Sequence, residues 1–153
     1  MKVLVIDDDD RMRRLIGKIL RLGGHQVVAA ADGVAGMQAF RDERPDVVLT
    51  DIIMPEQEGL GTIMMLLREN PKVKVIAVSG GGRVGNVDIL EAARTLGAHD
   101  VIAKPFKPRD LLSRVQQLVA ADDTATARKA PARENPGEAL QRLAAIARGS
   151  RAH

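Results

Sequence analysis

Short apolar runs alternate with longer stretches of helical period along most of the chain, and this alternation limits the possible folds more than any other feature. The runs, rich in β-branched residues, occupy positions 2–6, 26–30, 47–50, 74–78 and 101–103. The segments between and after them, 11–22, 33–41, 60–68, 84–96 and 109–120, place apolar residues on one helical face. Five β–α repeats of this length imply a parallel sheet covered by helices on both faces. We therefore expect an α/β fold of five strands and five helices.

The residues after position 121 differ in composition from those before it. Positions 122–134 are rich in Ala, Thr, Arg and Pro without an apolar period, which is typical of a flexible linker. The run Asn-Pro-Gly-Glu at 135–138 has the features of a helix start, and Gly149 is suited to end that helix. We expect a domain over 1–121, a linker over 122–135, a short helix over 136–148 and a tail over 149–153. This helix either lies frayed on the domain or binds a partner, and the sequence favours neither reading.

The composition is that of a globular domain and argues against several classes of protein. Of the 153 residues, 45% are hydrophobic and 28% are charged. No apolar run approaches the roughly 18 residues of a membrane span, so we expect no membrane partner. The absence of cysteine agrees with a cytoplasmic protein and excludes disulfides and thiolate metal sites. Residues 1–121 carry 17 basic and 16 acidic side chains, so the formal charge of +3 does not indicate a nucleic-acid-binding surface.

Polar side chains follow four of the five predicted strands at the point where each strand ends. Asp7 and Asp8 follow the first strand, Asp51 the third, Ser79 the fourth and Lys104 the fifth. In an open parallel α/β sheet, ligands bind beyond the carboxyl ends of the strands. We therefore expect three carboxylates, a hydroxyl and an ammonium to converge on one edge of the sheet.

This group of side chains suits phosphoryl transfer with a metal ion. Crowded carboxylates repel one another unless a cation is present, and a hard divalent ion such as Mg²⁺ prefers oxygen ligands. A carboxylate is also a competent nucleophile toward phosphorus and gives an acyl phosphate. Phosphoryl oxygens need nearby positive charge and hydrogen-bond donors, and Lys104 and Ser79 have the right chemistry to supply them.

Five separate motifs, in the same order and at the same spacing, resemble the receiver domain of response regulators in two-component systems, of the chemotaxis type with a single domain. They are Val-Leu-Val-Ile-Asp-Asp-Asp at 3–9, Asp-Ile-Ile-Met-Pro at 51–55 with Gly59, Val-Ile-Ala-Val-Ser at 75–79, Gly97-Ala98, and Lys104-Pro105-Phe106. The similarity runs from residue 1 to about residue 121. It implies a flavodoxin-like, doubly wound sheet with strand order 2-1-3-4-5.

The resemblance also implies a role for each residue of the predicted cluster. Asp51 is then the phosphoacceptor, Asp8 and Asp51 bind Mg²⁺ directly together with the Ile53 backbone carbonyl, Asp7 helps mainly through water, and Ser79 and Lys104 contact the phosphoryl group. The peptide bond between Lys104 and Pro105 is expected to be cis.

The implied function is that of a signalling switch rather than an enzyme with turnover. A histidine kinase, a histidine phosphotransfer protein or a small phosphodonor would supply the phosphoryl group, and a downstream protein target would read the result. The 32 residues after position 121 are too few and too irregular for a helix-turn-helix domain. We therefore expect no direct DNA binding, and a dimer stays possible.

Three alternatives compete with this interpretation. The chain could be a docking or dimerisation module that works without phosphate. Asp7-Asp8-Asp9 also matches the Asp-x-Asp of aspartate-nucleophile phosphatases, but Arg11 stands where that family has Thr or Val. The glycine pattern at 80–85 follows the fourth strand rather than the first, which disfavours dinucleotide binding. We assign Asp9 and Asp10 to helix capping.

The sequence departs from many receivers three residues before the lysine of the site. Many members carry Tyr or Phe there, whereas this chain has Val101. An aromatic switch cannot operate at that position. We expect the glycines at 80–82 to carry the coupling instead, because glycine permits large backbone rearrangement.

Overall fold

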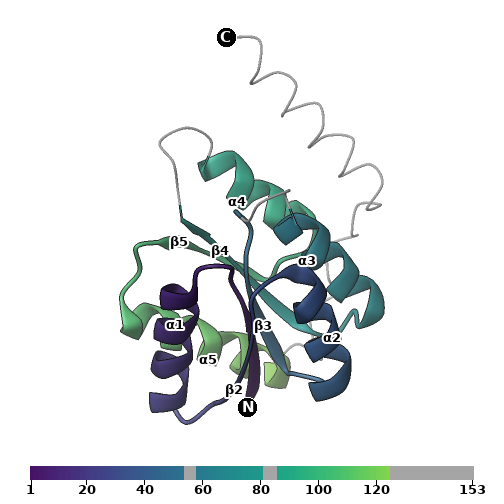
Figure 1. The fold of residues 1–153 in the computed structure, drawn as a ribbon. Helices are drawn as coiled ribbons and strands as arrows, with labels where there is room; N and C mark the ends of the chain where they lie inside the picture. Colours follow the sequence, from purple (N-terminus) through teal and green to yellow (C-terminus); the bar gives the residue numbers. More distant parts are fainter. Residues whose placement is uncertain (54–57, 81–85, 125–153) are drawn as a thin grey trace.

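Five parallel strands form one sheet at the centre of the computed structural model, which describes residues 1–53, 58–80 and 86–124 (Figure 1). The strands are β1 (Lys2–Ile6), β2 (Gln26–Ala30), β3 (Val47–Asp51), β4 (Lys74–Gly80) and β5 (Asp100–Lys104). Their order in the sheet is β2-β1-β3-β4-β5. The predicted fold class and strand order are both confirmed.

Five helices cover the two faces of the sheet. They are α1 (Asp10–Leu22), α2 (Gly33–Glu43), α3 (Glu58–Glu69), α4 (Asn86–Thr95) and α5 (Pro108–Thr124). Figure 1 shows α1 and α5 on one face and α2, α3 and α4 on the other. The last helix continues to Thr124, so the first three residues of the predicted linker belong to α5. The remaining linker, the predicted helix at 136–148 and the tail lie outside the described residues, and their division stays a prediction.

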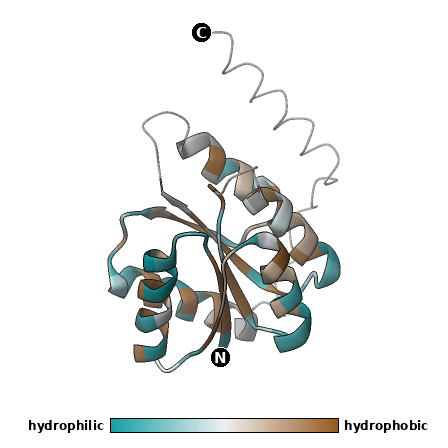
Figure 2. Cartoon of the chain, viewed as in Figure 1, coloured by the Kyte–Doolittle hydropathy of each residue, from teal (hydrophilic) through white to brown (hydrophobic). Residues whose placement is uncertain are grey.

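Each face of the sheet contributes to its own buried cluster. Val3 and Val5 of β1 pack on the side of α1 and α5, whereas Leu4 and Ile6 pack on the side of α2, α3 and α4. This alternation is what period-two side chains dictate in a strand that is buried on both faces. Figure 2 shows the result, with hydrophobic strands inside and hydrophilic residues on the outer surfaces of the helices. Among the residues that the structure describes, no helix is both long and apolar enough to cross a membrane.

Local caps fix where the helices begin and end. The Asp9 side chain accepts hydrogen bonds from the backbone amides of Arg11 and Met12, which confirms it as the N-cap of α1. Asp32 has the same role at the start of α2. After α4 the chain turns at Gly97, whose φ of 111° is readily adopted only by glycine.

The strand register brings the ends of β1, β3, β4 and β5 to one edge of the sheet. Ile6 pairs with Thr50, Asp51 pairs with Val78, and the two final residues of β4 and β5 pair with each other. The side chains that follow or end these strands therefore start from neighbouring backbone positions. This edge is where the candidate site lies.

His25, in the turn between α1 and β2, makes stability depend on pH. Both of its ring nitrogens are buried and have no hydrogen-bond partner in the described part of the chain, and burial, with the N-terminal ammonium, lowers its pKa. The unfolded chain therefore binds a proton more readily than the folded chain as the pH falls through about 6.5. We expect the free energy of unfolding to fall with pH in this range, and to fall less steeply in a His25→Leu variant. Urea unfolding between about pH 7 and pH 5 tests this, and parallel curves for the two proteins would contradict it.

Candidate functional site

Three carboxylates meet at the carboxyl edge of the sheet. Asp7 follows β1, Asp8 is the next residue, and Asp51 ends β3. Each offers an oxygen atom, and these oxygens lie within 4.8 Å of one another. Asp7 and Asp51 are buried, the latter with only 6% of its surface exposed, whereas Asp8 is exposed. The structure thus brings together the three acids that the strand-end argument selected.

Lys104 joins the two buried acids from the end of β5. Its Nζ atom lies 3.0 Å from Asp7 Oδ2 and 3.0 Å from Asp51 Oδ2. The lysine side chain is largely buried, so both ion pairs are shielded from water. The peptide bond between Lys104 and Pro105 is cis, as expected.

The electrostatics of the cluster leave negative charge to be compensated. Burial raises the pKa of Asp51, although the Ile53 amide and the Lys104 ammonium act in the opposite direction. Burial alone would lower the pKa of Lys104, but its hydrogen bonds to Asp7 and Asp51 and the negative charges of these acids together raise it. One ammonium thus faces three carboxylates. An oxygen-only donor set with excess negative charge fits a hard divalent cation.

Backbone contacts hold Asp51 in its place. Its Oδ1 accepts a hydrogen bond of 2.9 Å from the Ile53 amide, and the amide of Ile52 donates to the Val78 carbonyl across the sheet at 3.0 Å. The side chain of Ile53 is exposed at the rim of the site. The predicted metal-binding role of the Ile53 carbonyl stays a prediction, and the Met-Pro pair at 54–55 lies outside the described residues.

Ser79 lies near the end of β4, at the same edge of the sheet as this cluster. It follows Val78, the register partner of Asp51, and is only 1% exposed. Its Oγ atom is buried and makes no hydrogen bond with any residue that the structure describes. An unsatisfied buried hydroxyl costs about 1–3 kcal/mol. A hydroxyl in this state is suited to donate to an oxygen-rich ligand such as a phosphoryl group.

Gly80 has a role that the sequence analysis did not identify. It pairs with Lys104 in the sheet, and a Cβ atom at this position would lie 3.0 Å from the Cδ atom of that lysine. The missing side chain therefore makes room for the lysine stem on its way to the acids. The sequence pointed to this glycine only for its backbone freedom, since its position opposite the lysine depends on strand register. Gly81 and Gly82, the rest of the predicted coupling loop, lie outside the described residues.

Val101 is part of the packed core. It is buried in the cluster on the α2, α3 and α4 side of the sheet, together with Ala93 and Ala98. The position where many receivers carry an aromatic side chain is therefore filled here by an aliphatic one.

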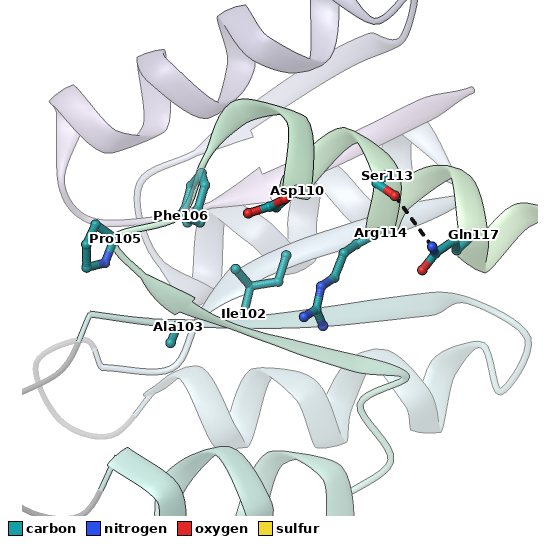
Figure 3. A pocket seen from close by; sticks show the side chains of 8 residues that line it. All are labelled: Ile102, Ala103, Pro105, Phe106, Asp110, Ser113, Arg114 and Gln117. Atoms are coloured by element: carbon teal, nitrogen blue, oxygen red, sulfur yellow. Dashed lines mark hydrogen bonds between the residues drawn. The ribbon is translucent and has the colours of Figure 1, made fainter.

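A groove of about 590 Å³ lies apart from the acidic cluster, between β5 and α5 (Figure 3). Arg114 reaches from α5 toward β5, where its Nη1 donates to Asp100 Oδ1 at 2.7 Å and to the Val101 carbonyl at 3.2 Å. None of the three acids, the lysine or the serine lines this groove. The groove therefore lacks the side chains of the acidic cluster, although Ala103 and Pro105, the neighbours of Lys104, line it.

Comparison with known proteins identifies the same residues as a known domain. The family described as response regulator receiver domain matches residues 3–116. The probable transcriptional regulator ycf27 of Cyanophora paradoxa is 33% identical over 125 residues, which are 82% of this chain and 51% of that protein. The DNA-binding response regulator MtrA of Mycobacterium leprae is 31% identical over 122 residues, 80% of this chain and 52% of that protein. The chain thus spans about half the length of these relatives.

Solved structures agree with this assignment. A response regulator receiver domain protein from Clostridium thermocellum has a TM-score of 0.74 at 27% identity, covering 80% of this chain and 97% of that one. A CheY-like receiver domain protein from Methanospirillum hungatei has a TM-score of 0.71 at 28% identity, covering 80% and 96%. These similarities support the resemblance from which the roles of the site residues were expected.

The relatives contradict the expectation that excludes direct DNA binding. That expectation rested on the 32 residues after position 121, which are too few for a helix-turn-helix domain. Yet proteins that share this receiver sequence include a DNA-binding response regulator and a probable transcriptional regulator. The length of one segment therefore gives no ground for excluding DNA-binding regulation.

The close packing of α3 on the end of β3 makes Gly59 necessary for the shape of the site. A Cβ atom at Gly59 would lie 2.4 Å from the Asp51 carbonyl oxygen and 2.4 Å from Ile52 Cα. Because both neighbours are backbone atoms, we expect Gly59→Ala to lower the free energy of unfolding by about 1–3 kcal/mol. Gly61→Ala is the matched control, since nothing lies within 4 Å of its added Cβ. It should raise stability by up to about 1 kcal/mol through helix propensity. Equal effects in urea unfolding would contradict the steric argument.

Proposed function

This chain belongs to the response regulator receiver domain family, and on that premise we propose that it accepts a phosphoryl group on Asp51 and thereby switches a protein-binding surface. The observation that carries the proposal is the pair of contacts from Lys104 to Asp51 and Asp7. It gives the acceptor carboxylate a neighbouring positive charge in a largely buried setting, where electrostatic interactions are stronger than in water.

The transfer step follows from the groups around Asp51. An Asp51 oxygen forms a bond to phosphorus while the bond from phosphorus to the donor's imidazole nitrogen breaks, and the electron pair of that bond stays on the nitrogen. The product is an acyl phosphate. Lys104 offsets negative charge on the phosphoryl oxygens, and the unpaired Ser79 hydroxyl donates a hydrogen bond to one of them.

The carboxylates of Asp7, Asp8 and Asp51 are the residues that would hold Mg²⁺, with the Ile53 carbonyl as a further ligand. A bound Mg²⁺ supplies charge compensation for the phosphoryl oxygens. Asp7 is already bonded through both oxygens, to the Asp9 amide at 2.9 Å and to Lys104. Asp51 is bonded in the same way, to the Ile53 amide and Lys104, so the assignment of Asp7 as a ligand that acts mainly through water rests on the family resemblance. The carboxylate of Asp8 is exposed, which suits direct binding.

The proposed partners follow from this chemistry. A histidine kinase or a histidine phosphotransfer protein supplies the phosphoryl group in the cytoplasm, and a downstream target reads the phosphorylated surface. The only reactions of the domain itself are its phosphorylation, also from small phosphodonors, and its own dephosphorylation. A receiver is therefore a signalling domain whose output is a shift between two conformations.

Replacing the acceptor tests the proposal directly. We expect Asp51→Asn to reduce phosphoryl incorporation from a small phosphodonor with Mg²⁺ to background, because an amide does not form the acyl phosphate. Asp42→Asn, an exposed position on α2, should behave like the wild type. Intact-protein mass spectrometry gives the readout, and lability to hydroxylamine identifies an acyl phosphate.

The same variants separate phosphorylation from phosphate-independent docking. If the phosphoryl group is the signal, Asp51→Asn abolishes the cellular output of the protein while Asp42→Asn preserves it. Unchanged output with Asp51→Asn would contradict the phosphorylation-dependent switch and favour a docking module.

Leu15 is suited to contact the protein donor. It is 48% exposed on the second turn of α1, the helix that begins directly beside the acids. We expect Leu15→Ala to raise the KM for transfer from the donor protein about tenfold, the effect of one well-packed interface residue. The rate with a small phosphodonor should not change. Leu22→Ala, which alters a 79% exposed leucine at the far end of α1, is the control. Equal effects of the two substitutions would contradict docking at Leu15.

A further inference from the structure

The side chain of Arg13 turns back from α1 toward the end of β1. Its Nη1 donates to the backbone carbonyl of Asp7 at 2.8 Å, and its Nη2 donates to Asp10 Oδ1 at 2.7 Å. Only 18% of the side chain is exposed. The guanidinium therefore connects the first turn of α1 to the backbone between two residues of the acidic cluster.

The carbonyl that Arg13 contacts belongs to the peptide unit that joins Asp7 to Asp8. The Asp7 side chain is already fixed at both oxygens, by the Asp9 amide and by Lys104. The exposed carboxylate of Asp8 makes no hydrogen bond with any described residue. The position of Asp8 therefore depends on the orientation of its backbone, and the contact from Arg13 restrains the peptide that leads into it.

The neighbouring Arg14 provides the natural comparison. It pairs with the other oxygen of the same aspartate, Asp10 Oδ2, at 3.0 Å, but it is 80% exposed and does not contact Asp7. The two arginines share a residue type, a helix turn and an ion-pair partner. They differ in exposure, and only Arg13 donates a hydrogen bond to the Asp7 carbonyl.

We infer that Arg13 is a positioning residue that orients the peptide between Asp7 and Asp8, so that Asp8 presents its carboxylate to a divalent cation. This inference rests on the proposed function, since it concerns how the receiver binds its metal ion. A residue that orients a ligand in this way typically affects metal affinity by about 10- to 100-fold when it is replaced.

Charge and positioning predict opposite effects at this residue. A guanidinium that contacts the backbone of Asp7 brings positive charge close to the acidic cluster and repels an incoming cation, so loss of the charge alone would strengthen Mg²⁺ binding. Loss of the restraint on the Asp7 carbonyl would weaken Mg²⁺ binding, because Asp8 must then be ordered when the ion binds. The sign of the change in affinity therefore distinguishes the two roles.

The test compares Arg13→Gln with Arg14→Gln in the full chain. We expect Arg13→Gln to bind Mg²⁺ about tenfold more weakly in titration calorimetry, and Arg14→Gln to bind as tightly as the wild type or slightly more tightly. Without metal, hydrogen exchange at the Asp9 amide, which bonds to Asp7 Oδ1, should be faster in Arg13→Gln alone. Thermal unfolding of each variant shows that the fold is retained.

The outcomes separate this inference from the proposed function. Wild-type protein that takes up neither Mg²⁺ nor beryllofluoride would contradict the proposed function itself. Wild-type uptake with unchanged or tighter Mg²⁺ binding in Arg13→Gln would overturn only the role of Arg13. If Arg13→Gln does not fold, Arg13→Lys decides, because it keeps the charge but cannot reach both acceptors. Arg13→Lys should bind Mg²⁺ several-fold more weakly, and wild-type affinity in this variant would overturn the inference.

Discussion

The ion pairs from Lys104 to Asp7 and Asp51 are the interaction on which the rest of the site depends. Removing charges from water costs several kcal/mol per ion, and the cost is recovered only where partners and hydrogen bonds are well placed. Here the partners come from the ends of three different strands, so the register of the sheet has to be correct before the charges can pair. Gly80 meets a second requirement, because its missing side chain leaves space for the lysine stem.

Much of this arrangement could be predicted from sequence, because it follows from one geometric property of parallel sheets. Parallel strands end at a common edge, so Asp7, Asp51, Ser79 and Lys104 were expected to converge once the strands were assigned. Short buried strands and period-3.6 helices are strong signals, and the sheet order and the five helices of the described domain are confirmed. The N-cap at Asp9 was also predictable, since capping is a local interaction.

What could not be predicted depends on contacts between side chains in different elements, or on facts outside the sequence. The hydrogen bond from Arg13 to the Asp7 carbonyl requires a particular rotamer, and the contact of Gly80 with Lys104 requires the register of two strands 24 positions apart. The residues at 122–124 resemble a linker in composition but continue α5, because composition does not fix the residue at which a helix ends. The expectation of no direct DNA binding was wrong because it rested on the length of the segment after position 121. The length of that segment does not determine what a receiver regulates.

Val101 and Ser79 together constrain how phosphorylation of Asp51 can be transmitted. Val101 lies in a packed cluster and is stiff at χ1, so it cannot swing between rotamers as an aromatic side chain on the surface can. Ser79 is buried next to Gly80, and Gly80 in turn faces the stem of Lys104. In the proposed function the Ser79 hydroxyl and the Lys104 ammonium bind the phosphoryl group, and Gly80 is the residue at the end of β4 that adjoins both side chains. Since an aromatic switch cannot operate at Val101, we expect movement of either group to be transmitted through the main chain at Gly80, because glycine permits large backbone rearrangement.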